Sequence, residues 1–162
     1  MKNRVVLREK VLLWTMLIMI VSLLGACQKE IINNDDLKCP VTAVEGPDDK
    51  IIGKWKLVKT RTSGFTQPSR IEDYSCGNII YHFKQDGSLV VSGVQEGVLS
   101  RFENGEYSFV FSATPISEGM EEKFKFTLEI GLGDIPCYIN DNNMAINYLP
   151  RDGNGYYFVR VE

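Results

Sequence analysis

Side chains that commonly carry chemistry are sparse in this sequence of 162 residues. His82 is the only histidine, and the four cysteines include no CxxC pair, so a zinc site is not expected. Gly131-Leu132-Gly133 lacks the third glycine and the following helix of a dinucleotide-binding loop. Asp152-Gly153-Asn154-Gly155 lacks the distant glutamate of a calcium loop and is typical of a turn. We therefore expect a protein that is not an enzyme and that holds neither a metal nor a cofactor.

Cys27 has the clearest chemical context of the four cysteines. A basic start, with Lys2, Arg4 and Arg8, precedes an apolar run over residues 11–24, as in a signal peptide. Leu24-Gly25-Ala26-Cys27 resembles a bacterial lipobox, in which the thiol is diacylated, the chain is cut before the cysteine and the new amine is acylated. A plain signal peptide with a chance cysteine and an uncleaved anchor are the alternatives. Because two or more acyl chains give stable anchoring, we predict a signal peptide over residues 1–26 and lipidation of Cys27.

Residues 27–50 are polar and acidic, without a lasting apolar period. This composition predicts a flexible tether between the lipid and a domain over residues 51–162. Lys29-Glu30 and Asp35-Asp36 resemble the short charged signals that send some Gram-negative lipoproteins to the outer face of the outer membrane. A solvated linker explains these charges equally well. We expect an outer-membrane location, with the surface-exposed and periplasmic sides left open.

The charge of the chain restricts its partners. The net charge is −3, and residues 1–26 carry four of the 18 basic and one of the 21 acidic residues, so the remainder is near −6. A net acidic chain without a basic cluster argues against nucleic-acid binding, which depends on neutralising phosphates. It would also be repelled by an anionic membrane surface, so membrane attachment must come from the lipid. We expect the protein to be a monomer.

The elements that would position any site are short strands. Alternation of apolar and polar residues, broken by turn residues, predicts eight strands, over residues 51–59, 78–84, 89–92, 106–111, 122–130, 137–139, 144–148 and 156–161. No amphipathic helix is evident. The long connection over residues 61–77 is a candidate lid. An immunoglobulin-like sandwich would prefer a tryptophan between two cysteines, whereas Trp55 precedes both Cys76 and Cys137. The fold predicted is an all-β, eight-stranded antiparallel up-and-down barrel.

Residues 51–162 resemble the lipocalin-like lipoproteins of Gram-negative gut bacteria. Gly53-Lys54-Trp55 on the first strand is similar to the Gly-x-Trp motif of lipocalins, and Arg160 sits where lipocalins carry an arginine that packs over this tryptophan. The segment over residues 78–83, followed by Asp86-Gly87, is similar to a hairpin of the same family. The resemblance implies that Gly53, Trp55 and Arg160 close one end of the barrel. It does not transfer a ligand.

The inward-facing side chains of the predicted strands are aromatic and aliphatic. One interpretation is a calyx for a small hydrophobic ligand, with tyrosine hydroxyls orienting its polar end. The alternative is a packed barrel that serves as a structural or interaction module and binds a protein or glycan through its loops. The predicted calyx residues are Leu57, Tyr81, Phe83, Tyr107, Phe109, Phe126, Leu128, Met144, Ile146 and Tyr148.

Three cysteines remain after Cys27. An exported protein meets an oxidising compartment, so one disulfide and one free thiol are expected. The starts of the second and sixth predicted strands lie at the same end of an up-and-down barrel. This placement favours a disulfide between Cys76 and Cys137, although Cys39 in the tether could compete for either partner.

Overall fold

The computed structural model describes residues 36–47, 49–62, 68–115, 124–131, 134–140, 142–147 and 153–162, and the structural statements below refer to these ranges. Cys27, the predicted signal peptide and Tyr148 lie outside them. No helix within these ranges has the length and apolar character needed to cross a membrane.

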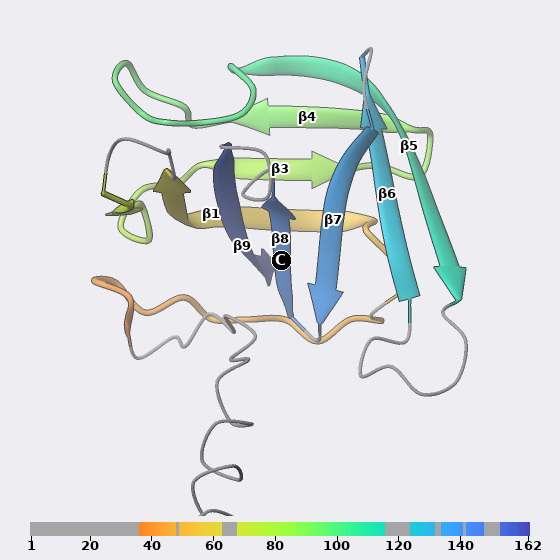
Figure 1. The fold of residues 1–162 in the computed structure, drawn as a ribbon, viewed down its shortest axis with the longest axis horizontal. Helices are drawn as coiled ribbons and strands as arrows, with labels where there is room; N and C mark the ends of the chain where they lie inside the picture. Colours follow the sequence, from red (N-terminus) through yellow and green to blue (C-terminus); the bar gives the residue numbers. More distant parts are fainter. Residues whose placement is uncertain are drawn as a thin grey trace, which may run out of the picture. The chain divides into compact units, whose positions relative to one another are not determined.

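All elements of the described chain are strands, and they form one antiparallel sheet (Figure 1). Their order in the sheet is β2-β1-β3-β4-β5-β6-β7-β8-β9. Their bounds are β1 Gly53–Thr62, β2 Arg70–Asp73, β3 Ile80–Phe83, β4 Ser88–Ser92, β5 Gly105–Pro115, β6 Phe124–Ile130, β7 Asp134–Asn140, β8 Asn143–Asn147 and β9 Asn154–Val161.

Pairing of β1 with β9 closes the sheet into a barrel. Trp55 lies opposite Arg160 in this pairing, and the other edge of β1 pairs with β3, where Trp55 lies opposite Tyr81. The predicted eight-stranded antiparallel barrel is therefore confirmed, with β2 as one additional strand. Apolar side chains at alternate positions of the strands favour closure, because they give the curved sheet an apolar inner face to bury.

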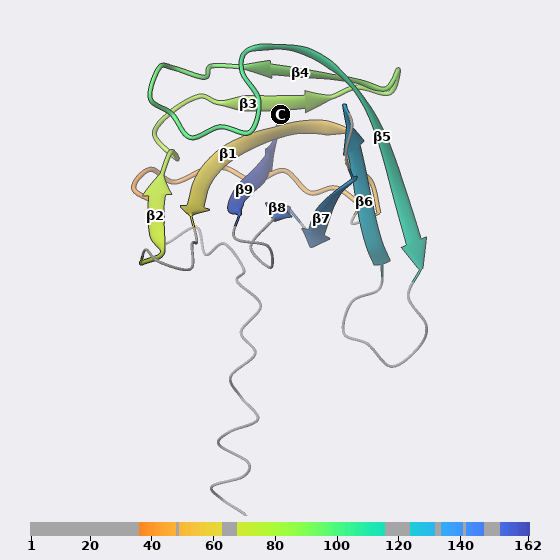
Figure 2. The same cartoon turned by 45° about the horizontal axis from the view of Figure 1, so that its top comes forward.

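The additional strand β2 lies within the connection that was predicted to be a lid. It pairs with the second half of β1, from Lys59 opposite Asp73 to Thr62 opposite Arg70, and Figure 2 shows it beside that end of β1. The sequence of β2 shows no alternation of apolar and polar residues, since its one apolar residue is Ile71, which is exposed. Residues 70–73 of the predicted lid thus extend the sheet.

Residues 36–47, which we call the strap, run along the outside of the barrel (Figure 1). Val58 follows the inward-facing Leu57, so the alternation of the strand directs Val58 to the outer face, and the register of β1 with β9 shifts at this residue. Val58 and Val159 form a small apolar cluster with Leu37 and Val41 of the strap. The described part of the predicted tether is therefore held on the barrel.

A loop over residues 93–104 connects β4 to β5 and packs on the main core through Val94, Val98 and Phe102. Gly93 starts the loop with a φ of +81°. A Cβ atom there would lie 1.9 Å from the carbonyl oxygen of Asn78, so both the backbone angle and the close approach require glycine. This turn directs the loop back over the barrel.

Candidate functional site

The interior of the barrel, where a calyx was predicted, is lined by buried side chains. The described calyx residues all belong to the main core or pack against it, and Tyr107 is the one that is half-buried. Several rings pack against each other: Tyr81 meets Phe158 with ring centroids 4.8 Å apart, and Phe83 meets Phe109 at 5.0 Å. Such edge-on contacts are typical of a packed aromatic core.

The hydroxyl of Tyr81 bonds to the loop over residues 93–104. It lies 2.7 Å from Ser100 Oγ, and the Phe102 amide donates to it at 3.4 Å. Burial raises the pKa of the Tyr81 phenol, so this hydroxyl stays protonated in the core. The hydroxyl that was expected to orient a ligand therefore bonds to the protein itself.

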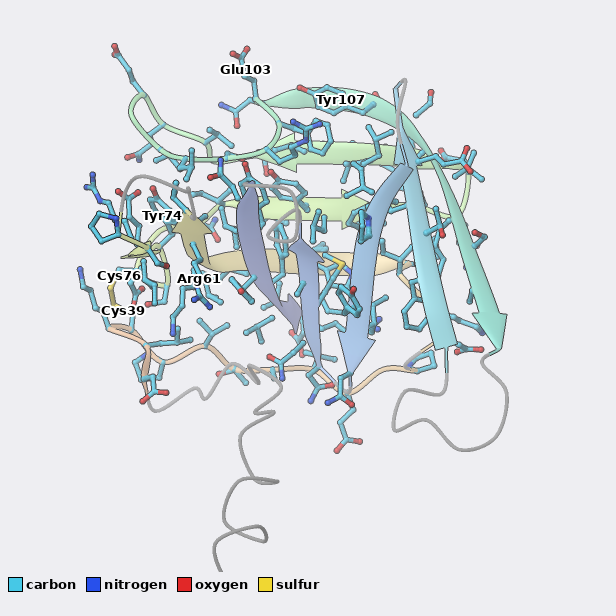
Figure 3. The ribbon with its side chains drawn as sticks, in the orientation of Figure 1. Cys39, Arg61, Tyr74, Cys76, Glu103 and Tyr107 are labelled. Atoms are coloured by element: carbon cyan, nitrogen blue, oxygen red, sulfur yellow. A yellow bond between two sulfur atoms is a disulfide. The ribbon has the colours of Figure 1, made fainter. Side chains whose placement is uncertain are left out.

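Two further tyrosines attach the same loop to the barrel. The Tyr107 hydroxyl donates to the Glu103 carbonyl oxygen at 3.0 Å, and Figure 3 shows both residues at this end of β5. The Leu99 amide donates to the hydroxyl of Tyr74 at 3.1 Å. Both hydroxyls thus bond to backbone groups of this loop.

Arg160 covers Trp55 with its guanidinium 4.2 Å from the ring centroid. This is the contact that the family resemblance implied for the pair. The guanidinium also donates to three backbone carbonyl oxygens, those of Ile52 at 3.2 Å, Pro47 at 3.1 Å and Lys50 at 2.9 Å. Arg160 is only 6% exposed, so these bonds are shielded from water. The arginine thus ties the residues before β1 to the last strand.

Gly53, the third residue of the predicted closure, has a φ of +131°, which disfavours any other residue type there. A Cβ atom at this position would lie 3.7 Å from a guanidinium nitrogen of Arg160. Trp55 is held from the other direction, since its indole N–H donates to the Ile51 carbonyl oxygen at 2.7 Å. The motif therefore serves the geometry of this end of the barrel.

The disulfide joins Cys39 of the strap to Cys76 in the turn after β2, as Figure 3 shows. Hydrogen bonds bring the two segments together: the Cys39 amide donates to Ser75 Oγ at 3.0 Å, and the Lys38 amide donates to Asp73 Oδ2 at 2.8 Å. Desolvation acts to raise the pKa of the Asp73 carboxyl, but bonds from Ser75 and Lys38 outweigh it and lower the pKa.

The predicted disulfide between Cys76 and Cys137 is wrong. Cys137 lies within β7, between Phe126 on β6 and Ile146 on β8, and is 1% exposed. The error arose because β7 begins at Asp134, so Cys137 is in the middle of a strand and not at the rim. Burial raises the pKa of this free thiol to about 12, which makes it unreactive.

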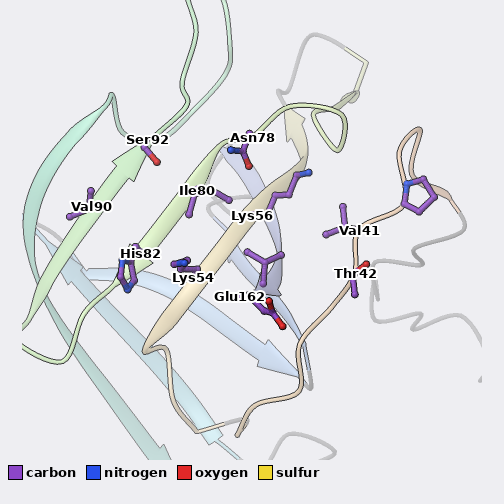
Figure 4. Close-up of a pocket in the computed structure, with 12 residues that line it drawn as sticks. Val41, Thr42, Lys54, Lys56, Asn78, Ile80, His82, Val90, Ser92 and Glu162 are labelled. Atoms are coloured by element: carbon purple, nitrogen blue, oxygen red, sulfur yellow. The ribbon is translucent and has the colours of Figure 1, made fainter.

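The described residues form a groove on the outer face of the barrel, which we call the outer groove (Figure 4). Its volume is about 590 Å³. Strands β1, β3 and β4 supply its floor, and the strap and the end of β9 supply the wall. The lining residues are Pro40, Val41, Thr42, Lys54, Lys56, Asn78, Ile80, His82, Val90, Ser92, Val161 and Glu162.

Strand pairing orders the floor of the outer groove. Lys54 lies opposite Val161 on β9 and His82 on β3, and His82 lies opposite Val90 on β4. Directly opposite residues have Cβ atoms about 5 Å apart, so these four side chains form a row across the sheet. Lys56 pairs with Ile80 in the same way, which places a second ammonium beside a second aliphatic side chain.

The two ammonium groups in the outer groove are not paired with a carboxylate among the described residues. In the part of the chain that the structure covers, neither Lys54 nor Lys56 has a carboxylate within ion-pair distance. Ile80, His82 and Val90 between and beside them are half-buried. The groove therefore combines an aliphatic floor with two ammonium groups and an imidazole. It offers no group of three metal-binding side chains among the described residues.

Sequence reasoning missed the outer groove, although one signal was present. Residues 79–81 and 89–91 are consecutive apolar residues, so both faces of β3 and β4 carry aliphatic side chains. Strict alternation would place polar residues at the two outer-face positions that Ile80 and Val90 occupy. His82 points to the outer face, away from Tyr81 and Phe83, and its neighbours in the groove, Lys54 and Val90, come from separate strands.

Comparisons of the chain with protein-family models, with curated proteins and with solved structures find no match in any of the three.

Proposed function

We propose that this protein is a lipid-anchored, non-enzymatic binding module of the cell envelope, whose barrel is a packed scaffold and whose outer groove recognises a partner. The observation that carries this proposal is the position of the groove. It lies outside the barrel, on β1, β3 and β4, while the inward residues of the same strands pack in the core.

Coverage of the barrel also supports recognition on the outside. The loop over residues 93–104 packs on the core and accepts and donates bonds to Tyr81 and Tyr107, and Arg160 covers Trp55. A ligand that entered the interior would have to break these contacts. A ligand in the outer groove would not.

A lipid on Cys27 would hold the protein at the membrane. Asp36, where the described strap starts, comes nine positions after Cys27, and an extended chain of that length spans about 30 Å. The barrel would therefore stay close to the membrane. Cys27→Ala should move the protein from the membrane fraction to the soluble or secreted fraction, as measured by immunoblot. Retention of the variant in membranes at the wild-type level would refute the anchor.

Site-specific photo-crosslinking in the cells that make the protein tests the groove. Replacing His82 with benzoylphenylalanine should give a discrete cross-linked product with another protein, because His82 lies in the floor of the groove. The matched control carries the same replacement at Tyr138, which is 43% exposed and does not line the groove. Equal products from both positions, or none from His82, would contradict recognition through the groove.

The closed barrel also supports a second candidate, a small hydrophobic ligand among the inward residues, because eight-stranded barrels of this kind can hold one small molecule. Trp55 is buried in this core and reports on it. Oleate and retinol should leave the fluorescence of Trp55 unchanged if the barrel is a packed scaffold. A saturable change with either compound would favour the calyx.

A further inference from the structure

We propose that the occupant of the outer groove is an acidic, extended segment of another polypeptide. The inference rests on the proposed function and adds the chemical class of the partner. It depends on three features of the groove, which are its charge, its aliphatic floor and the spacing of its ammonium groups.

The charge of the groove differs from that of the chain. The chain carries a net charge of −3, yet Lys54 and Lys56 lie on one strand with a single carboxylate side chain, Glu162, in the groove lining. Lys84, by contrast, is paired with Glu106 at 3.4 Å, just beyond Val90 in the sheet. Two adjacent ammonium groups on an acidic protein attract an anion and repel a cation.

The floor of the groove favours a polypeptide over a polysaccharide. Ile80 and Val90 are half-buried, and the half-buried Val161 continues the aliphatic surface at the wall. No lining residue except His82 carries an aromatic ring, so the groove lacks the broad aromatic faces on which sugar rings stack. Aliphatic side chains of a peptide could bury this surface and gain about 25 cal/mol per Å² of apolar area.

The spacing of the ammonium groups fits an extended chain. Lys54 and Lys56 are two residues apart on β1, so their side chains leave the same face about 7 Å apart. An extended peptide repeats with the same spacing, and alternate side chains point to opposite sides. A peptide lying above β3 would direct acidic side chains towards Lys54 and Lys56 and the intervening side chains towards Val90.

A direct binding measurement tests this inference. The probe is a fluorescein-labelled octapeptide of alternating glutamate and valine, titrated by anisotropy against the full-length protein in nonionic detergent. We expect saturable binding that weakens as salt rises from 0.05 to 0.5 M, because exposed charges are screened. Lys54→Gln combined with Lys56→Gln should weaken binding at least tenfold. Lys59→Gln is the matched control, since Lys59 is on the same strand outside the groove lining and should leave the affinity unchanged.

Several results would overturn the inference. The first is that the peptide shows no saturable binding. The second is that Lys59→Gln weakens peptide binding as much as the double variant does. The third is that a peptide with glutamine in place of glutamate binds as tightly as the original. Equal affinity for polygalacturonate would assign the groove to acidic polymers in general, and a cross-linked product of twice the mass would identify a second copy of this chain. If the peptide fails to bind while His82 still cross-links to another protein, the acidic class is wrong and the proposed function stands. If both experiments fail, the groove is not a binding site.

Discussion

Replacing both Cys39 and Cys76 with serine is expected to lower the free energy of unfolding by about 4 kcal/mol. The disulfide closes a loop with a sequence separation of 37 residues, and removing this restraint increases the entropy of the unfolded chain. Denaturation in urea, followed by the fluorescence of Trp55, measures the loss. Dithiothreitol should destabilise the wild type by a similar amount and leave the double variant unchanged.

Cys137→Ala is the control for the pairing of this disulfide. Cys137 is a free, buried thiol, so its replacement should preserve the sensitivity of the protein to dithiothreitol. If Cys137→Ala abolished that sensitivity, Cys137 would be a partner in the disulfide and the pairing of Cys39 with Cys76 would be refuted. The result also bears on the outer groove, because Cys39 adjoins the strap residues that form its wall.

Arg160→Ala is expected to cost about 3 kcal/mol or more in the free energy of unfolding. The change removes three hydrogen bonds from a charged donor to backbone carbonyl oxygens, each worth roughly 1.5–3 kcal/mol in isolation though not additive. It also removes the contact of the guanidinium with the Trp55 ring, worth about 0.5–2 kcal/mol. Thermal and urea unfolding of the variant measure the sum.

Two variants separate the causes of this loss. Arg160→Lys keeps the charge but loses the planar fork, so it should recover less than half of the stability. Arg101→Ala is the matched control, because the Arg101 guanidinium lies 5.6 Å from the Phe102 ring centroid but is exposed, and it should cost less than about 1 kcal/mol. A loss below about 1 kcal/mol for Arg160→Ala would mean that this end of the barrel is held by other contacts.

Most of the strands that the sequence predicted correctly have alternating burial, although β9 is buried on both faces. In β6, the inward residues Phe126, Leu128 and Ile130 are buried, and such a period of two is visible in a few neighbouring residues. Strand β2 was missed because Ile71 is exposed and its pairing with β1 gives no apolar pattern. The contact of Arg160 with Trp55 was predicted through a family resemblance, and periodicity alone would not have paired these residues.

Local patterns in the sequence were enough to determine the all-β class, the eight strands that close the barrel and the side chains that face its core. Local patterns are sufficient here because the period of two in a strand can be read from a few consecutive residues. The tertiary structure alone decided that Cys39 pairs with Cys76, that the strap lies on Val58 and Val159, and that the outer groove exists. Each of these joins segments distant in the sequence, and which segments meet depends on strand order, register and packing across the whole barrel.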